Sequence, residues 1–212
     1  EKTQAGEADH LFLYPAHSYA LPGATVNFAL KAADRNYVAA DVPGSISWST
    51  NFGAVGEGKL VLDTSSFNAV VSAKAEGMSA RATVTILQQV TGISVYKEDG
   101  KTRLKTLHTP AETDVQLSAG ATYYGSAVLC APGSFTWEVT GGIGTITESG
   151  KFTSAKVTKL TEGTIEVSYG ETTASIPVTV SPANPFSDTK GHWAETYIND
   201  LYFEGTLTGS AG

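Results

Sequence analysis

The chain has 212 residues, of which 17% are charged and 41% hydrophobic, and its formal net charge is −7. This length predicts one or two domains. The acidic balance, without any basic run, excludes nucleic acid and a polybasic membrane contact as partners. We expect no membrane insertion, because no apolar run is long enough to cross a bilayer. With a single cysteine, Cys130, an internal disulfide is also excluded.

The chain opens with a polar segment at 1–9, which we interpret as a linker. A first strand is predicted at 10–14, where Pro15 ends it. Apolar residues then alternate with other residues at 26, 28 and 30, which predicts a strand with one buried face. A polar loop is expected at 31–41, and it carries the carboxylates of Asp34 and Asp41. These two could bind calcium together, but no calcium-loop motif is present, so we predict no metal site.

The segment 42–48 predicts a Pro-Gly turn followed by a short strand that ends on Trp48. Apolar alternation continues in three further stretches, at 60–62, 71–75 and 82–86. This makes about seven short strands separated by frequent turn signals, the pattern of a β sandwich. Trp48 is interpreted as a structural core residue, with sugar stacking as the alternative.

The segment 131–137 repeats 42–48, which places Trp137 89 residues after Trp48. Gly58-Lys59-Leu60 is echoed by Gly150-Lys151-Phe152, so the chain contains two copies of one β domain. We assign residues 1–9 to a linker, 10–89 to the first domain, 90–182 to the second, and 183–212 to a tail. Trp137 is the second expected core tryptophan.

In the second copy, a first strand is predicted at 93–96 and a hairpin-type turn at 97–101. Residues 101–114 are polar and predict no regular structure. The apolar alternation at 123–129 is taken as the counterpart of 26–32, at an offset of 97. Strands are also expected at 135–139, 165–169 and 174–180. Because Pro177 cannot donate a ladder hydrogen bond, the last of these is predicted to be an edge strand.

The order of these features resembles bacterial immunoglobulin-like domains of group 2. The Trp strand is followed by Gly-Lys-Φ and by alternating strands that end in Val-Thr-Ile or Val-Thr-Val, over 10–87 and 93–181. The resemblance implies an all-β fold, with two tandem immunoglobulin-like sandwiches and a short C-terminal helical segment. It also implies an exposed surface protein that serves as a spacer or adhesin stalk rather than an enzyme.

Beyond a proline-rich break at 181–185, the apolar period changes to that of a helix, with a stripe at 194, 197, 198 and 201. We predict a helix over 190–203, capped by Asp188 or Thr189 and ended by Gly205. It should bury the face formed by Ala194, Ile198 and Leu201.

This tail resembles the opening half of an S-layer homology motif. The matching positions are Phe186-Ser187-Asp188, Gly191-His192-Trp193-Ala194-Glu195, Ile198, Leu201, Gly205 and Gly209. The family binds secondary cell-wall polysaccharide of Gram-positive bacteria, which implies an extracellular, cell wall-associated protein. Asp188, His192 and Trp193 are the candidate polysaccharide contacts, although Trp193 could equally pack against the helix. Because the second half of the motif would follow residue 212, we expect weak or no wall binding by this chain alone.

The segments 8–15 and 21–26 resemble the region that follows the catalytic domain in bacterial surface phosphodiester glycosidases. This resemblance implies that a catalytic part precedes Glu1 in the parent protein.

No nucleophile, base and orienting group occur together in the sequence, and the four histidines lack metal-ligand spacing. We therefore predict no enzyme activity, no catalytic residue, no cofactor and no metal. Two hypotheses remain: a stalk between a head and a wall anchor, or a binding module for a glycan or a host protein. An exposed aromatic cluster would favour the second, and the candidates for it are Tyr37 and Phe52.

Overall fold

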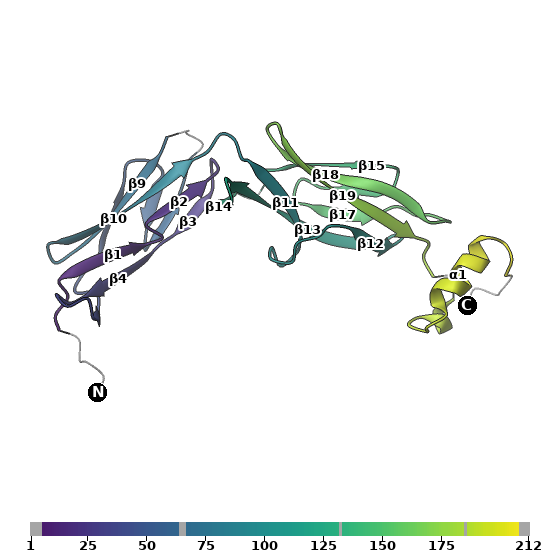
Figure 1. The fold of residues 1–212 in the computed structure, drawn as a ribbon, viewed down its shortest axis with the longest axis horizontal. Helices are drawn as coiled ribbons and strands as arrows, with labels where there is room; N and C mark the ends of the chain where they lie inside the picture. The colour runs from purple at the N-terminus through teal and green to yellow at the C-terminus, as the bar shows by residue number, and fades with distance from the viewer. Residues whose placement is uncertain (1–5, 64–66, 132, 185, 208–212) are drawn as a thin grey trace. The chain divides into compact units, whose positions relative to one another are not determined.

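The computed structural model describes residues 6–63, 67–131, 133–184 and 186–207. These residues form two compact units, of which unit 1 comprises 1–91 with 121–134, and unit 2 comprises 92–120 with 135–212 (Figure 1). Both units are built from antiparallel and parallel strand pairs, and one short helix lies near the C-terminus, so the predicted all-β class is confirmed. Pro132, Pro185, Gly209 and the first five linker residues lie outside the described residues.

Unit 1 contains three sheets, ordered β1-β4-β5, β14-β2-β10-β9-β6 and β3-β8-β7. Its strands are short, and they outnumber the seven expected from the sequence. Their bounds are β1 His10–Tyr14, β2 His17–Ala20, β3 Thr25–Asn27, β4 Ala29–Ala33, β5 Ala39–Ala40, β6 Ser47–Thr50, β7 Ala54–Gly56, β8 Lys59–Val61, β9 Ala69–Ala75, β10 Met78–Ile86 and β14 Ser126–Leu129.

The strand predicted across 26–30 is two strands, because the chain changes sheet at Phe28. Before it, β3 pairs with β8; after it, β4 pairs with β1. The Phe28 amide donates to the Gly58 carbonyl at 2.6 Å, which keeps the backbone paired at the change. The predicted loop at 31–41 is also corrected, since β4 continues through Ala33 and forms a hairpin with β5.

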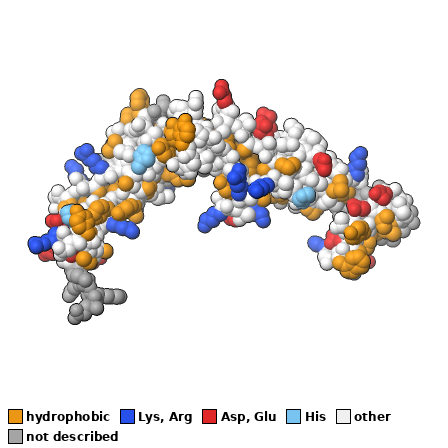
Figure 2. All heavy atoms as spheres, in the orientation of Figure 1, with side chains coloured by type: hydrophobic (Ala, Val, Ile, Leu, Met, Phe, Trp, Pro, Cys, Tyr) orange, Lys and Arg blue, Asp and Glu red, His pale blue; other side chains and the backbone are white. Residues whose placement is uncertain are grey.

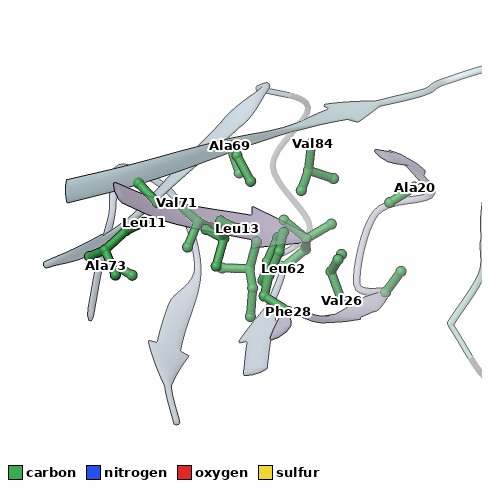
Figure 3. Close-up of a cluster of buried hydrophobic side chains, with 14 of the residues drawn as sticks. Leu11, Leu13, Ala20, Val26, Phe28, Leu62, Ala69, Val71, Ala73 and Val84 are labelled. Atoms are coloured by element: carbon green, nitrogen blue, oxygen red, sulfur yellow. The ribbon is translucent and has the colours of Figure 1, made fainter. Parts of the chain in front are cut away.

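Alternate residues of these strands point into one apolar core (Figure 3). Leu11 and Leu13 of β1 contribute to it, as do Val71 and Ala73 of β9, while the residues between them face outward. This inward and outward alternation is the expected consequence of the two-residue side-chain period of a strand. Burial of the predicted apolar positions at 60, 62, 71, 73, 75, 82, 84 and 86 is confirmed.

Unit 2 contains the four-stranded sheet β12-β19-β18-β15 and the strand series β16-β17-β13, with β11 paired to β13. Its most deeply buried positions include Leu117, Ile143, Phe152, Ile165 and Val167. The strand bounds are β11 Gly92–Lys97, β12 Leu107–Pro110, β13 Asp114–Tyr123, β15 Thr136–Thr140, β16 Gly144–Ile146, β17 Lys151–Ser154, β18 Thr161–Tyr169 and β19 Thr172–Ser181.

Two expectations for unit 2 are wrong. Residues 101–114 are not irregular throughout, because β12 lies among them and pairs in parallel with β19. Strand β19 is consequently not an edge strand, since β12 and β18 flank it. Pro177 is tolerated because β12 pairs with Val178–Ser181, beyond the proline.

Strand pairing also corrects the alignment of the two copies. Val26 pairs with Leu60 in unit 1, and Val115 pairs with Phe152 in unit 2. Val115, rather than Tyr123, is therefore the counterpart of Val26, at the same offset of 89 that relates the two tryptophans. The sequence alone suggests the offset of 97, because the apolar alternation of this strand continues into the next hairpin at 123–129. The boundaries 10–89 and 90–182 stay a proposal.

The C-terminal segment contains a 3-10 turn, Ser187–Thr189, and one helix, α1, at Glu195–Phe203. The helix begins five residues later than predicted, because Gly191 adopts a left-handed φ of 78° and interrupts the helical backbone. Ala194, and neither Asp188 nor Thr189, occupies the N-cap, and it makes no side-chain capping bond. The predicted stop at Gly205 is confirmed by its φ of 76°.

No helix in the described part of the chain is both long and apolar enough to span a membrane.

Candidate functional site

The three candidate wall-polysaccharide contacts lie on the surface of the C-terminal segment. Asp188 and His192 are exposed, and the Trp193 side chain is 83% exposed. The His192 and Trp193 rings have centroids 5.5 Å apart, and the His192 Nδ1 accepts a hydrogen bond from the Ala194 amide at 3.2 Å. Trp193 therefore presents its ring to solvent instead of packing against α1.

A network around Asn184 and Glu195 fixes the path of this segment. The Asn184 side-chain amide donates to Glu195 Oε1 at 2.7 Å, and the Gly191 amide donates to Glu195 Oε2 at 2.6 Å. These two hydrogen bonds, that from Gly191 foremost, hold the pKa of Glu195 below its ordinary value. The charged carboxylate thus ties the turn at 191 to the first residue of α1.

Large apolar side chains on the outside of this segment form an exposed surface (Figure 2). Tyr197 is 68% exposed and Leu201 40%, whereas Ile198 and Ala194 are half-buried. The predicted helix face is thus partly covered and partly open. Phe186 packs edge-on against Tyr202, with ring centroids 5.2 Å apart, and anchors the covered side.

A groove of about 500 Å³ lies beside the same segment in unit 2. Leu160, Asn184, Glu195 and Asn199 are among its lining residues, and Asp188, His192 and Trp193 are not. The Asn199 Oδ1 is buried without a hydrogen-bond partner among the described residues. The structure therefore does not bring the three candidate contacts into one pocket.

Trp48 and Trp137 occupy equivalent positions in the two units, each over a glycine. A Cβ atom placed on Gly58 would lie 3.5 Å from the Trp48 ring, and one on Gly150 would lie 3.2 Å from the Trp137 ring. Both side chains are half-buried, and Trp48 packs against the apolar core of unit 1.

Four rings lie next to one another on the outer face of β1 and the neighbouring turn, and we name this group the aromatic strip. It consists of His10, Phe12, Tyr14 and Tyr37. His10 and Tyr37 stack almost parallel, with centroids 4.6 Å apart and an interplanar angle of 9°. Phe12 lies 6.4 Å from Tyr37 and 6.5 Å from Tyr14. Lys31 of β4 places its ammonium group 5.5 Å from the centre of the Tyr14 ring.

Asp34 holds the turn that presents Tyr37. Its carboxylate accepts hydrogen bonds from the amides of Gly6, Asn36 and Val38 at 2.9, 2.8 and 3.0 Å. These bonds, led by that from Gly6, lower the pKa of Asp34. Asp34 is buried at 5% exposure and its carboxylate is engaged by the backbone, whereas Asp41 is exposed.

The residues that the structure describes contain no cluster of three or more His, Cys, Asp or Glu side chains that could hold a metal ion. The Cys130 thiol is half-buried, donates to the Val128 carbonyl at 3.3 Å, and has its pKa raised by burial. Cys130 lies directly after β14.

No family model matches the chain, and no curated protein matches it. Domains 1–6 of the surface-layer protein SbsC align with this chain at 15% identity and a TM-score of 0.35. The alignment covers 84% of this chain and 27% of the SbsC chain, so this chain spans about a quarter of the length of that protein. Domains 5–6 of SbsC align at 12% identity and a TM-score of 0.36, over 84% and 99% of the two chains. InvD of Yersinia pseudotuberculosis aligns at 16% identity and a TM-score of 0.32, over 82% and 57%.

Sequence reasoning missed the aromatic strip, although part of its signal was visible. His10, Phe12 and Tyr14 alternate with the buried Leu11 and Leu13, so their common outward face could have been predicted from the strand period. Tyr37 joins them only through the β4–β5 hairpin, which the sequence had suggested was an unstructured loop. Phe52, the other aromatic candidate, instead stacks with Phe67 at 5.0 Å.

Proposed function

We propose that this chain is a non-catalytic segment of an extracellular, cell wall-associated protein of a Gram-positive surface. In this proposal two immunoglobulin-like β units act as a stalk between an N-terminal head and a wall anchor. The head is the catalytic part that the glycosidase-like start implies, and the anchor is a set of complete S-layer homology motifs. Their ligand would be secondary cell-wall polysaccharide.

The observation that carries this proposal is the repetition of one building block directly before the anchor-like tail. Trp48 over Gly58 and Trp137 over Gly150 occur at matching places in the two units, and Val26 and Val115 have matching strand partners. Serial repetition of one structural unit is typical of proteins that extend by adding copies. Such an arrangement supports a spacer.

The wall contact is proposed to lie in the tail. Trp193 and His192 are exposed and adjacent, which suits stacking on a sugar ring once the rest of the motif surrounds them. The exposed apolar surface at Tyr197 and Leu201 supports packing of further motif segments on α1.

A reporter experiment tests the stalk. The chain is given an N-terminal epitope tag and extended by three complete S-layer homology motifs, then bound to isolated Gram-positive walls. Because β14 at 126–129 belongs to the main sheet of unit 1, the two units are removed together. We expect deletion of residues 6–182, with the tag kept at the new N-terminus, to leave wall binding unchanged and to reduce access of an antibody to the epitope. Loss of wall binding on deletion would show that the β units are part of the anchor, and unchanged access would show that they are no spacer.

The alternative, a binding module for a glycan or a host protein, is favoured by one feature of unit 1, the aromatic strip.

A further inference from the structure

We propose that the aromatic strip of unit 1 is a binding platform for an anionic pyranose polysaccharide. This goes beyond the stalk function, because it assigns a ligand to the outer face of β1 and its neighbouring turn. In Figure 2 hydrophobic side chains run along the part of the surface where Figure 1 places β1, and a histidine lies at the end of the run.

The ring geometry suits flat sugars. A pyranose ring has an apolar face of C–H groups, which is attracted to the electron-rich face of an aromatic ring. Tyr37 is 69% exposed and rests on His10 on one side, so its other side is open to a sugar. Phe12 lies 6.4 Å from Tyr37 with an interplanar angle of 43°, and Tyr14 lies 6.5 Å from Phe12 with an angle of 32°, so successive rings would contact successive sugar units at different angles.

Tyr37 is held in a backbone conformation that a bulky side chain rarely adopts. Its φ is 62°, in the left-handed region, where Gly, Asn and Asp are the usual residues. The turn keeps this conformation because Asp34 bonds the amides of Asn36 and Val38, and the Tyr37 amide donates to the Asp34 carbonyl at 2.9 Å. The turn therefore fixes the position of the Tyr37 ring beside β1.

Charge selects among polysaccharides. The whole chain carries a net charge of −7, and the two ends of the strip differ in charge. At the Tyr14 end the ammonium group of Lys31 lies 5.5 Å from the ring centre, and at the other end the Asp9 carboxylate lies 3.4 Å from His10 Nε2, so an anionic group would be placed at the Tyr14 end. A carboxylate or phosphate on a sugar stacked at Tyr14 would meet this ammonium group, whereas a neutral glycan would gain nothing from it. The chemistry therefore favours an anionic glycan, whether its charge comes from uronate or phosphate.

The size of the strip argues against a folded protein as the occupant. A stable protein interface takes about 800 Å² and about 20 or more residues from each partner. The strip has four rings, of which His10 and Phe12 are half-buried. A chain of sugar units, which needs a narrow track of rings, matches this shape.

The test is electrophoresis of the full 212-residue chain through native gels that contain polygalacturonate, a phosphorylated mannan or neutral hydroxyethylcellulose. We expect retardation by one or both anionic polysaccharides, weakened by added salt. Tyr37→Asn removes the ring and keeps a residue that tolerates the left-handed turn, so it should weaken binding by about tenfold or more without unfolding unit 1. Lys31→Gln should reduce retardation by the anionic polysaccharides and leave migration through the neutral hydroxyethylcellulose gel unchanged.

Phe67→Ala is the matched control, because Phe67 is a 61% exposed aromatic of the same unit that lies outside the strip. It should leave retardation unchanged. Three results would overturn the proposal: no retardation in any gel, equal retardation of Tyr37→Asn and Phe67→Ala, or self-association of the chain that Tyr37→Asn abolishes in the absence of glycan. None of these results bears on wall anchoring by the tail, so the stalk proposal can fail or survive independently.

Discussion

At the scale of single residues, each unit depends on a glycine that lies beneath a tryptophan. A Cβ atom on Gly150 would approach the Leu117 carbonyl oxygen to 2.6 Å and the Trp137 ring to 3.2 Å, and the residue has a φ of 80°. The same constraints act on Gly58, with Phe28 and Trp48 as the neighbours. These glycines were visible in the sequence as an echo, but the reason for them required the three-dimensional contact.

The first prediction follows from this contact. Gly150→Ala should lower the free energy of unfolding of unit 2 by about 2 kcal/mol, from clash and backbone strain together. Gly170→Ala is the control, because Gly170 also has a positive φ, of 58°, but nothing lies within 4 Å of its added Cβ. Urea denaturation followed by tryptophan fluorescence measures both. Equal losses for the two variants would refute the role of Trp137 as a cover on Gly150.

The second prediction concerns Asp34 and pH. Because backbone hydrogen bonds lower the folded-state pKa of Asp34, its stabilising contribution is present above the ordinary value of 3.8 and is lost as pH falls below it. Asp34→Asn should therefore lower the free energy of unfolding of unit 1 at pH 7. The difference in this free energy between the variant and the parent chain should shrink as the pH is lowered below 3.8. Denaturant titrations at several pH values provide the measurement.

Asp41→Asn is the control for this series, since Asp41 is an exposed carboxylate of the same region. It should change stability little at any pH. A difference between Asp34→Asn and the parent chain that grows at low pH would contradict the assignment of Asp34 as the charged anchor of the turn.

At the scale of elements, strand positions were more predictable than strand partners. The alternation of Leu11 with Leu13, and of Val71 with Ala73, identified β1 and β9, because burial on one face leaves a two-residue period. The change of sheet at Phe28 leaves no such trace, since the buried face continues through it. Strand β12 was missed for a related reason: its pairing with β19 is made by the backbone, which the residue types at 107–110 do not reveal.

The C-terminal helix provides the third prediction. Asn184→Ala removes the side-chain amide that holds Glu195, so the turn at 191 and the start of α1 lose their connection. We expect faster amide hydrogen exchange across 196–202, with exchange in β18 and β19 unchanged. Thr196→Ala is the control, because Thr196 is exposed and alanine is the better helix former. Equal exchange in the two variants would show that this network does not stabilise the helix.

At the scale of the whole molecule, the candidate sites were only partly predictable. Asp188, His192 and Trp193 came from a motif resemblance, and their exposure agrees with a surface contact. The aromatic strip could not be assembled from the sequence, because Tyr37 reaches β1 through a hairpin whose closure depends on the buried Asp34. Long-range contacts of this kind have no periodic signal in the chain.

The central claim is that wall attachment belongs to the C-terminal segment and its continuation, while the β units space it from the head. Sedimentation with purified Gram-positive walls tests this most directly. Three chains would be compared: residues 1–182, residues 1–212, and residues 1–212 extended by three complete S-layer homology motifs. All would carry Tyr37→Asn, so that the aromatic strip does not contribute.

We expect the extended chain to sediment with the walls, residues 1–212 to bind weakly or not at all, and residues 1–182 to remain in solution. Trp193→Ala in the extended chain should weaken binding, because it removes an exposed ring from the proposed contact. Sedimentation of residues 1–182 as strongly as the extended chain would contradict the account, since the β units would then be the anchor.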